Sequence, residues 1–278
     1  MLALKNIKTK QMQTSFSKSL QIQYQVIKAL VLREVITRWG RKNIAFLWLF
    51  VEPVIAILVI AVIWGIRGRA ESLIYSKFNI SVIAFVLIGY SSMMLWRNSA
   101  TMLSNAIKSN TALLHHRNLR PLDFYLSRFI LEVVGVSGAF FFLLFVLVFI
   151  NLIHPPSSIS HMTDAWFFFI WFALGFGMTF GPLISQYEIF AVIWRAISMA
   201  LFFVSGVFFF VAWLPIEYRE IVLLIPMVHG SEMIKHGYFG NIIQTYEDPY
   251  YLTLWCIFLN FTGFVIARIY GKSLPDRL

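Results

Sequence analysis

The chain is poor in cysteine and in charge, and each shortage excludes a class of protein. Its one cysteine, Cys256, rules out an intrachain disulfide and a metal site built from clustered cysteines. Only 13% of the 278 residues are charged while 59% are hydrophobic, and the mean hydropathy is +0.74. Because soluble domains carry about 25% charged residues, a water-soluble fold would have too little polar surface to cover its core. The composition therefore predicts a membrane protein.

Long apolar runs predict an all-α fold with six transmembrane helices. Each run has about 20 residues or more, which crosses ~30 Å of hydrocarbon at ~1.5 Å rise per residue. The fourth and fifth runs are separated only by a turn from Pro182 to Glu188. The predicted spans are residues 44–66, 80–99, 129–153, 165–184, 187–211 and 251–270.

Basic residues are distributed unevenly between the two sides that six spans define. Nine lie in the N-terminal tail, five in or beside the second loop and three at the C-terminus, against five on the opposite side. Because cytoplasmic segments collect lysine and arginine, we expect both termini in the cytoplasm. The net charge of +10 then reflects topology and attraction to anionic lipid, since no basic surface alternates with the stacking aromatics that nucleic-acid binding requires.

The predicted organisation is a cytoplasmic tail at 1–43, a six-span domain at 44–272 with an external stretch at 212–250, and a cytoplasmic C-terminus at 273–278. Residues 1–20 are polar and predicted to be disordered. The rest of the tail has helical periodicity and predicts an amphipathic helix on the cytoplasmic membrane surface. Its apolar face holds Ala29, Leu32, Val35, Ile36 and Trp39, and its polar face holds Arg33, Glu34, Thr37, Arg38, Arg41 and Lys42.

The segment LLHHRNLRPLDFY, residues 113–125, places a cationic cluster between the second and third spans. Asn110 or Thr111 can cap a short helix there, and Pro121 would end it, because the residue before proline is pushed out of the helical region. A polar loop that only carries topological charge is the alternative. Two adjacent histidines point about 100° apart on a helix and do not readily share one ion, so no metal site is expected.

Five stretches of the sequence carry a resemblance to a known family. They are LREVITRWGRKNIAFLWLFVEP (32–53), LWRNSA (95–100), LLHHRNLRPLDFYLSR (113–128), SGVFFFVAWLP (205–215) and PMVHGSEMIKHGYFGN (226–241). In this order and topology they resemble the inner-membrane permease subunit of the ABC-2 exporters of capsular polysaccharide in Gram-negative bacteria. The resemblance runs from about Ile22 to Lys272.

The resemblance implies a transport subunit and not an enzyme. The expected partners are a second identical chain, two nucleotide-binding ATPase subunits that use ATP-Mg, a periplasmic or envelope-spanning co-export protein, and a lipid-linked anionic polysaccharide. No cofactor is expected on this chain. The GKS at 271–273 is not a phosphate-binding loop, because Ile266 stands where that motif needs glycine.

The resemblance also implies that the first cytoplasmic loop carries a coupling helix, about Asn110 to Arg120, that docks on the ATPase. Such a cationic element would convert closure of the ATPase into movement of the second and third spans. The contact candidates are Leu113, Leu114, His115, His116, Arg117 and Arg120.

Charged and aromatic residues within the spans are candidates for the substrate path. Glu52 is costly in hydrocarbon unless paired, with Arg41 or Arg97 as expected partners, and both a structural and a substrate role stay open. Arg97 and Arg195 can meet the acidic groups of a glycolipid, and snorkelling to the interface is the alternative for Arg97. The aromatic candidates are Tyr90, Trp96, Trp194 and Phe208.

The external stretch contains two segments too short to span, which predict two re-entrant or interfacial helices. The resemblance places them at the outer mouth, where four residues would face headgroups or a periplasmic partner: His229, Glu232, Lys235 and His236. Because Glu232 precedes Lys235 by three residues and His236 by four, a local salt bridge is the alternative.

Three other functions remain open. The same class of exporter can carry O-antigen, teichoic acid or a hydrophobic compound, which neighbouring biosynthetic genes would distinguish. A membrane transferase needs clustered acids or a His-x₄-Asp pair, and Arg120 and Pro121 stand where His115 and His116 would need the aspartate. A secondary transporter needs paired acids near mid-membrane, and Glu52 stands nearly alone.

Reversing the charge of Arg117 and Arg120 to glutamate tests the coupling assignment. We expect the double variant to insert normally but to lose ATPase coupling and export, because a cationic docking element becomes anionic. Co-purification with the ATPase and cell-surface polymer are the two measurements. Normal co-purification together with normal export would refute the docking assignment.

Overall fold

The computed structural model describes residues 2–39, 80–113 and 119–273, together with positions 51, 54, 55 and 59. The regular structure in these ranges is helical throughout. The long helices are α1 (Leu2–Trp39), α3 (Val82–Ser104), α4 (Pro121–Phe149), α5 (Ile159–Gln186), α6 (Glu188–Val204) and α9 (Pro249–Ser273). The short ones are α7 (Ile216–Leu223), α8 (Pro226–Phe239) and the 3₁₀ turns η1 (Lys108–Leu113), η2 (Val211–Trp213) and η3 (Gly240–Ile242).

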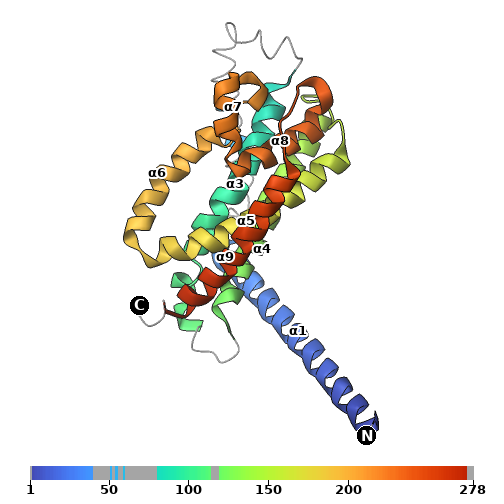
Figure 1. The fold of residues 1–278 in the computed structure, drawn as a ribbon, viewed down its shortest axis with the longest axis vertical. Coiled ribbons are helices and arrows are strands. Elements are labelled where there is room, and N and C mark those ends of the chain that lie inside the picture. Colours follow the sequence, from blue (N-terminus) through green and yellow to red (C-terminus); the bar gives the residue numbers. More distant parts are fainter. Residues whose placement is uncertain are drawn as a thin grey trace.

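The helices α3, α4, α5 and α9 form an elongated bundle with α5 at its centre (Figure 1). The helix α1 contacts α4 with its C-terminal half and projects away from the bundle, at the end where α9 also finishes. The short helices α7 and α8 lie at the opposite end (Figure 1). The N-terminal helix and the C-terminus therefore share one end of the molecule.

Three helices in the described ranges are long and apolar enough to cross a membrane: Pro121–Phe149, Ile159–Gln186 and Pro249–Tyr270. The helix α3 has 23 residues, but Arg97 and Asn98 interrupt its apolar character. The helix α6 has 17 residues, fewer than the ~20 that a span requires. The predicted span 44–66 lies outside the described residues. An all-helical membrane architecture is thus established, and the number of six spans stays a prediction.

Several predicted boundaries are wrong for identifiable reasons. The helix α5 continues through Pro182 to Gln186, so the chain turns at Tyr187 and not from Pro182. The predicted span 187–211 ends at Val204, because Gly206 adopts φ +80°, a left-handed conformation that stops a helix. The third predicted span begins at Pro121 instead of 129, since proline fits the first helical turn, where its missing N–H is not needed.

The tail differs from its prediction in two respects. The disorder predicted for residues 1–20 is wrong, because α1 is helical from Leu2. Leu32 and Ile36 of the predicted apolar face are exposed, as residues that contact lipid would be. The location of this face on the membrane surface stays a prediction. Leu30 and Glu34, which fall outside the predicted apolar face, are buried. A second face of α1 therefore packs against the protein.

Glycines allow α5 to approach two neighbours at backbone distance. A Cβ built on Gly181 would lie 2.7 Å from the Cβ of Leu103 on α3, and one on Gly175 would lie 2.7 Å from the backbone nitrogen of Asn260 on α9. A Cβ on Gly263 of α9 would lie 2.9 Å from the carbonyl oxygen of Gly175. Small residues at such contacts supply the close packing that stabilises helices in lipid, where no hydrophobic effect joins them.

Substituting Gly175 by alanine is expected to destabilise the bundle by about 1–3 kcal/mol, because the added methyl meets the backbone of Leu259 and Asn260, which cannot move aside as the Asn260 side chain could. Gly138 on α4 is the matched control, since a Cβ there meets nothing within 4 Å. Gly138→Ala should be neutral or stabilise by up to about 1 kcal/mol through helix propensity. Thermal unfolding in detergent measures both, and equal stabilities for the two variants would contradict the packing account.

Candidate functional site

A buried ion pair lies where α1 meets α4, at the end of the bundle that holds both termini. The Nε and Nη2 atoms of Arg128 donate to Oε1 of Glu34 at 3.2 and 3.1 Å. The two side chains are only 9% and 8% exposed. Charges removed from water to this extent require good geometry and further hydrogen bonds.

The loop after α3 supplies those further bonds. The amide nitrogen of Asn110 donates to Glu34 Oε1 at 3.1 Å and to the carbonyl of Ala106 at 2.9 Å, and its oxygen accepts from Arg33 at 2.5 Å. Arg128 also donates to Ser109 Oγ at 2.6 Å. We call Arg33, Glu34, Ser109, Asn110 and Arg128 the polar junction. It joins α1, η1 and α4.

A second contact fixes α1 against the start of α4. The side-chain amide of Gln23 donates to the carboxylate of Asp123. The same carboxylate accepts from the backbone N–H of Arg120 at 2.9 Å and so caps α4. Gln23 lies eleven residues before Glu34, about 16 Å along the helix. Bonds at two separated levels hold α1 in a fixed direction.

The predicted coupling element lies between two of these contacts. Asn110 of the polar junction stands at its start, and Arg120, the exposed N-cap residue of α4, stands at its end. The capping role predicted for Asn110 is wrong, because it lies inside η1 with φ −128° and its side chain bonds elsewhere. Of the predicted contact residues, Leu114, His115, His116 and Arg117 lie outside the described residues, as does the side chain of Leu113.

The aromatic path candidates are largely internal. Trp96 is fully buried and packs edge-on against Phe176, with ring centroids 5.4 Å apart. Trp194 is buried, stacks on Phe180 and donates to Thr101 Oγ1 at 3.3 Å. The Trp96 contact joins α3 to α5, and the Trp194 contacts hold α6 against α5 and α3.

The other path candidates are more accessible. Tyr90, Arg97 and Phe208 are partly buried, and Arg195 is exposed on α6. Glu52 lies outside the described residues. A role of these residues in a substrate path stays a prediction.

The end of the bundle formed by α7 and α8 contains a second buried pair. Lys235, fully buried, donates to Glu232 Oε1 at 3.1 Å and to the carbonyl of Phe209 at 2.5 Å. Its Nζ lies 4.8 Å from the ring centroid of Phe210. Burial lowers the pKa of Lys235, and the carboxylate of Glu232 opposes that change. Because the chain after Val204 is not helical, the lysine satisfies a carbonyl that lacks a helical partner.

The four residues predicted at the outer mouth have different partners. Glu232 and Lys235 form the local salt bridge that was the alternative to exposure at the mouth. His229 is buried, and its ring bonds the carbonyl of Leu223 at 2.7 Å and the N–H of Asp248 at 3.0 Å. His236 forms its ion-pair contact with Glu247, at 2.5 Å, and not with Glu232.

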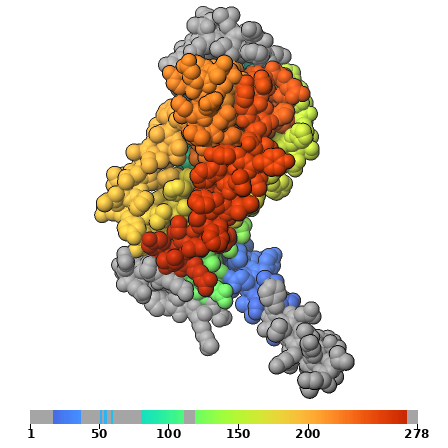
Figure 2. All heavy atoms as spheres, in the orientation of Figure 1, coloured from blue at the N-terminus to red at the C-terminus, as the bar shows by residue number. Residues whose placement is uncertain are grey.

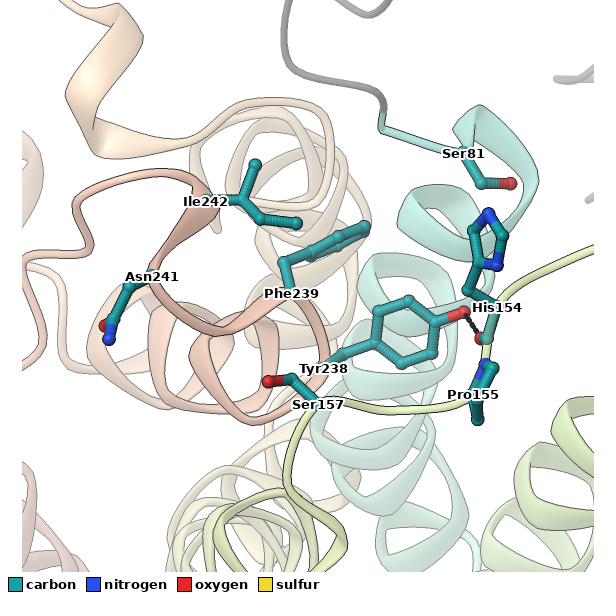
Figure 3. A pocket seen from close by; sticks show the side chains of 8 residues that line it. All are labelled: Ser81, His154, Pro155, Ser157, Tyr238, Phe239, Asn241 and Ile242. Carbon is teal, nitrogen blue, oxygen red and sulfur yellow. Dashed lines mark hydrogen bonds between the residues drawn. The ribbon is translucent and has the colours of Figure 1, made fainter.

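An open pocket of about 470 Å³ lies at the same end, between the start of α3, the α4–α5 connection and the end of α8 (Figure 3). Tyr238 donates to the carbonyl of His154 at 2.5 Å and closes one side of it (Figure 3). Hydroxyl, imidazole and amide groups share the lining with aromatic rings: Ser81, His154, Pro155, Ser157, Tyr238, Phe239, Asn241 and Ile242. In the described part of the chain, no group of His, Cys, Asp and Glu side chains is placed to hold a metal.

The long apolar helices of the bundle define a helical membrane protein. The family described as ABC-2 type transporter matches residues 25–239, and the chain belongs to this family.

The similar proteins are all named for the export or transport of polysaccharide. The chain is 41% identical over 264 residues to the capsule polysaccharide export inner-membrane protein CtrC of Neisseria meningitidis serogroup A, covering 95% of this chain and 98% of the relative. It is 42% identical over 265 residues, with the same coverage, to the protein BexB of Haemophilus influenzae, which bears the same description. The polysialic acid transport protein KpsM of Escherichia coli is 22% identical over 255 residues, covering 91% and 96%.

Removing one charge of the Glu34–Arg128 pair is expected to cost about 3–5 kcal/mol, because the other charge stays buried without its partner. Glu34→Gln and Arg128→Met should each lower the unfolding midpoint in detergent and increase cleavage of α1 by protease. The double variant should be less destabilised than the sum of the two.

Glu220→Gln, at an exposed position on α7, is the control and should change stability by less than about 0.5 kcal/mol. Additive effects of Glu34→Gln and Arg128→Met would show that the two side chains are not coupled.

Proposed function

We propose that this chain is the inner-membrane permease subunit of an ATP-driven exporter of lipid-linked capsular polysaccharide. The observation that carries the proposal is the 41–42% identity, over 95% of the chain, to capsule polysaccharide export proteins of two genera. The inner membrane as location is supported by the names of those relatives and by the apolar helices of the bundle. Both termini are proposed to be cytoplasmic, in keeping with their common end of the molecule (Figure 1).

The working assembly is proposed to contain two copies of this chain and two ATPase subunits. Six spans per chain would supply half of a transport channel, and a two-fold pair completes it. The chain would contribute no ATP chemistry itself. A periplasmic or envelope-spanning co-export protein would receive the polymer at the end formed by α7 and α8, which are proposed to be re-entrant.

The polar junction suggests how movement of the ATPase would reach the membrane. A docked coupling element begins at Asn110, whose amide bonds Glu34, and Glu34 is paired with Arg128 of α4. Since α3 runs directly into η1, displacement of the loop would shift α3, α4 and α1 together. Packed units of this kind switch between two discrete arrangements, and in this way a small displacement at one site becomes a larger movement of whole helices.

The polymer path is proposed to lie between the two copies. Arg195 on the exposed surface of α6, together with Arg97 and Glu52, would meet its acidic groups, while Tyr90 and Phe208 would offer aromatic faces. Such contacts would let the polymer slide along the path, because no single contact would hold it strongly. O-antigen, teichoic acid or another lipid-linked or hydrophobic cargo is the alternative for a member of this family.

An in-frame deletion of the gene tests the cargo. Loss of surface polymer with accumulation of polymer in the cytoplasm is the expected result, because synthesis continues while export stops. Complementation with the intact chain is the control. Unchanged surface polymer would mean another cargo, and polymer missing from both places would indicate a role in synthesis.

A further inference from the structure

A cationic pocket lies at the cytoplasmic end of the bundle, apart from the polar junction. Its volume is about 420 Å³, and the described residues that line it are Arg120, Pro121 and Leu122 at the start of α4 and Arg268 near the end of α9. That volume falls within the about 300–1,000 Å³ typical of ligand sites. Two arginines distant in the sequence thus share one cavity with an apolar floor.

Both guanidinium groups are available to a ligand. Within the described part of the chain, neither one donates a hydrogen bond to the protein or forms an ion pair. Asp123, three residues after Arg120, is buried, and its oxygens accept from the backbone of Arg120 and from Gln23. Its charge offsets part of that of Arg120, so the described lining of the pocket keeps a net positive charge through Arg268.

The pocket lies at the depth of lipid headgroups. Arg268 follows Pro249, the first residue of α9, by nineteen residues, or about 28 Å of helix. Tyr250, 85% exposed, suits the outer interface, which puts Arg268 across ~30 Å of hydrocarbon at the inner one. Between these levels both helices expose apolar side chains that lipid tails can cover, including Val134 of α4 and Phe261 of α9.

The chemistry of the pocket selects a phosphate. Guanidinium groups bind phosphate oxygens in a forked, charge-assisted geometry. The N-terminus of α4, a helix of 29 residues, adds the positive end of its dipole at the same place. Basic pockets between transmembrane helices on the cytoplasmic side are known to hold anionic lipid headgroups.

We propose that Arg120 and Arg268 bind the phosphodiester headgroup of an anionic lipid in the cytoplasmic leaflet. The lipid is either a bulk phospholipid of the membrane or the phosphate of the cargo's lipid anchor. The orientation of the site, and the second source, rest on the proposed function. Arg120 would then contact both the ATPase and the lipid. Arg268 is outside the predicted coupling contacts, so a substitution of Arg268 tests the pocket alone.

Native mass spectrometry of the purified protein, with phosphatidylglycerol or phosphatidylcholine added at equal concentration, measures the preference. The wild type should retain phosphatidylglycerol selectively. Arg268→Gln and Arg120→Gln should each weaken this retention about tenfold or more, the effect of losing one charge-assisted hydrogen bond. Arg268→Lys should retain part of it, because the charge stays and the fork is lost.

Lys28→Gln, an exposed cation on α1 at the same end of the molecule, is the matched control and should keep the full preference. Equal retention of phosphatidylglycerol by the wild type, Arg268→Gln and Lys28→Gln would overturn the proposal. So would equal retention of the two lipids by the wild type.

Protein purified from hosts with and without polymer synthesis distinguishes the two sources. Endogenous anionic lipid retained from both hosts identifies a bulk phospholipid, and lipid retained only from the polymer-making host identifies the anchor. Arg268→Gln should remove it in either case, and retention by this variant would refute the site. These results are independent of the deletion test: loss of export without a lipid preference would overturn the pocket and leave the permease assignment.

Discussion

The buried pair of Glu34 and Arg128 is the contact on which the end of the bundle where α1 meets α4 depends. Neither charge is stable away from water alone, so each requires the other together with Asn110 and Ser109. Those requirements bring three separate elements to one point: the N-terminal helix, the loop after α3, and α4. The cost of burying charge is therefore what fixes the geometry of the loop.

The same constraint acts at the opposite end of the bundle, beside α8, with a different result. After Val204 the chain leaves helical structure, and its carbonyl groups lose their helical partners. Lys235 reaches the carbonyl of Phe209, and Glu232 balances its charge. One oxygen of Glu232, Oε2, is buried without a hydrogen-bond partner in the described part of the chain. This end thus keeps a buried polar atom without a hydrogen-bond partner among the described residues, whereas Glu34 Oε1 in the polar junction accepts from both Arg128 and Asn110.

The apolar composition and the length of the apolar runs are enough to predict the long helices of the bundle. The apolar runs located α3, α4, α5 and α9, and the five quoted stretches identified the family. Sequence reasoning failed where a residue's role depends on a distant partner. Arg128 counts as one more basic residue at a loop edge and Glu34 as part of a polar helix face, because only the fold brings them together.

The helix ends were missed for a local reason. Proline is ambiguous in a sequence: Pro182 stays inside α5, while Pro121 begins α4. The buried Trp96 and Trp194 show that the direction of a helix face is equally hard to predict. Helical periodicity alone does not distinguish a side that packs on protein from a side that faces a channel.

The distribution of contacts separates a rigid part from a looser one. Close backbone approaches at Gly175 and Gly181 join α5 to α9 and α3, and moving those helices apart would break contacts along their whole length. The helix α6, at the edge of the molecule in Figure 2, buries only Trp194 and Ser198. Few buried contacts mean low local stability. The helix α6 is therefore held more loosely than α5, and Trp194 joins it to the bundle through its hydrogen bond to Thr101 of α3 and its stacking on Phe180 of α5.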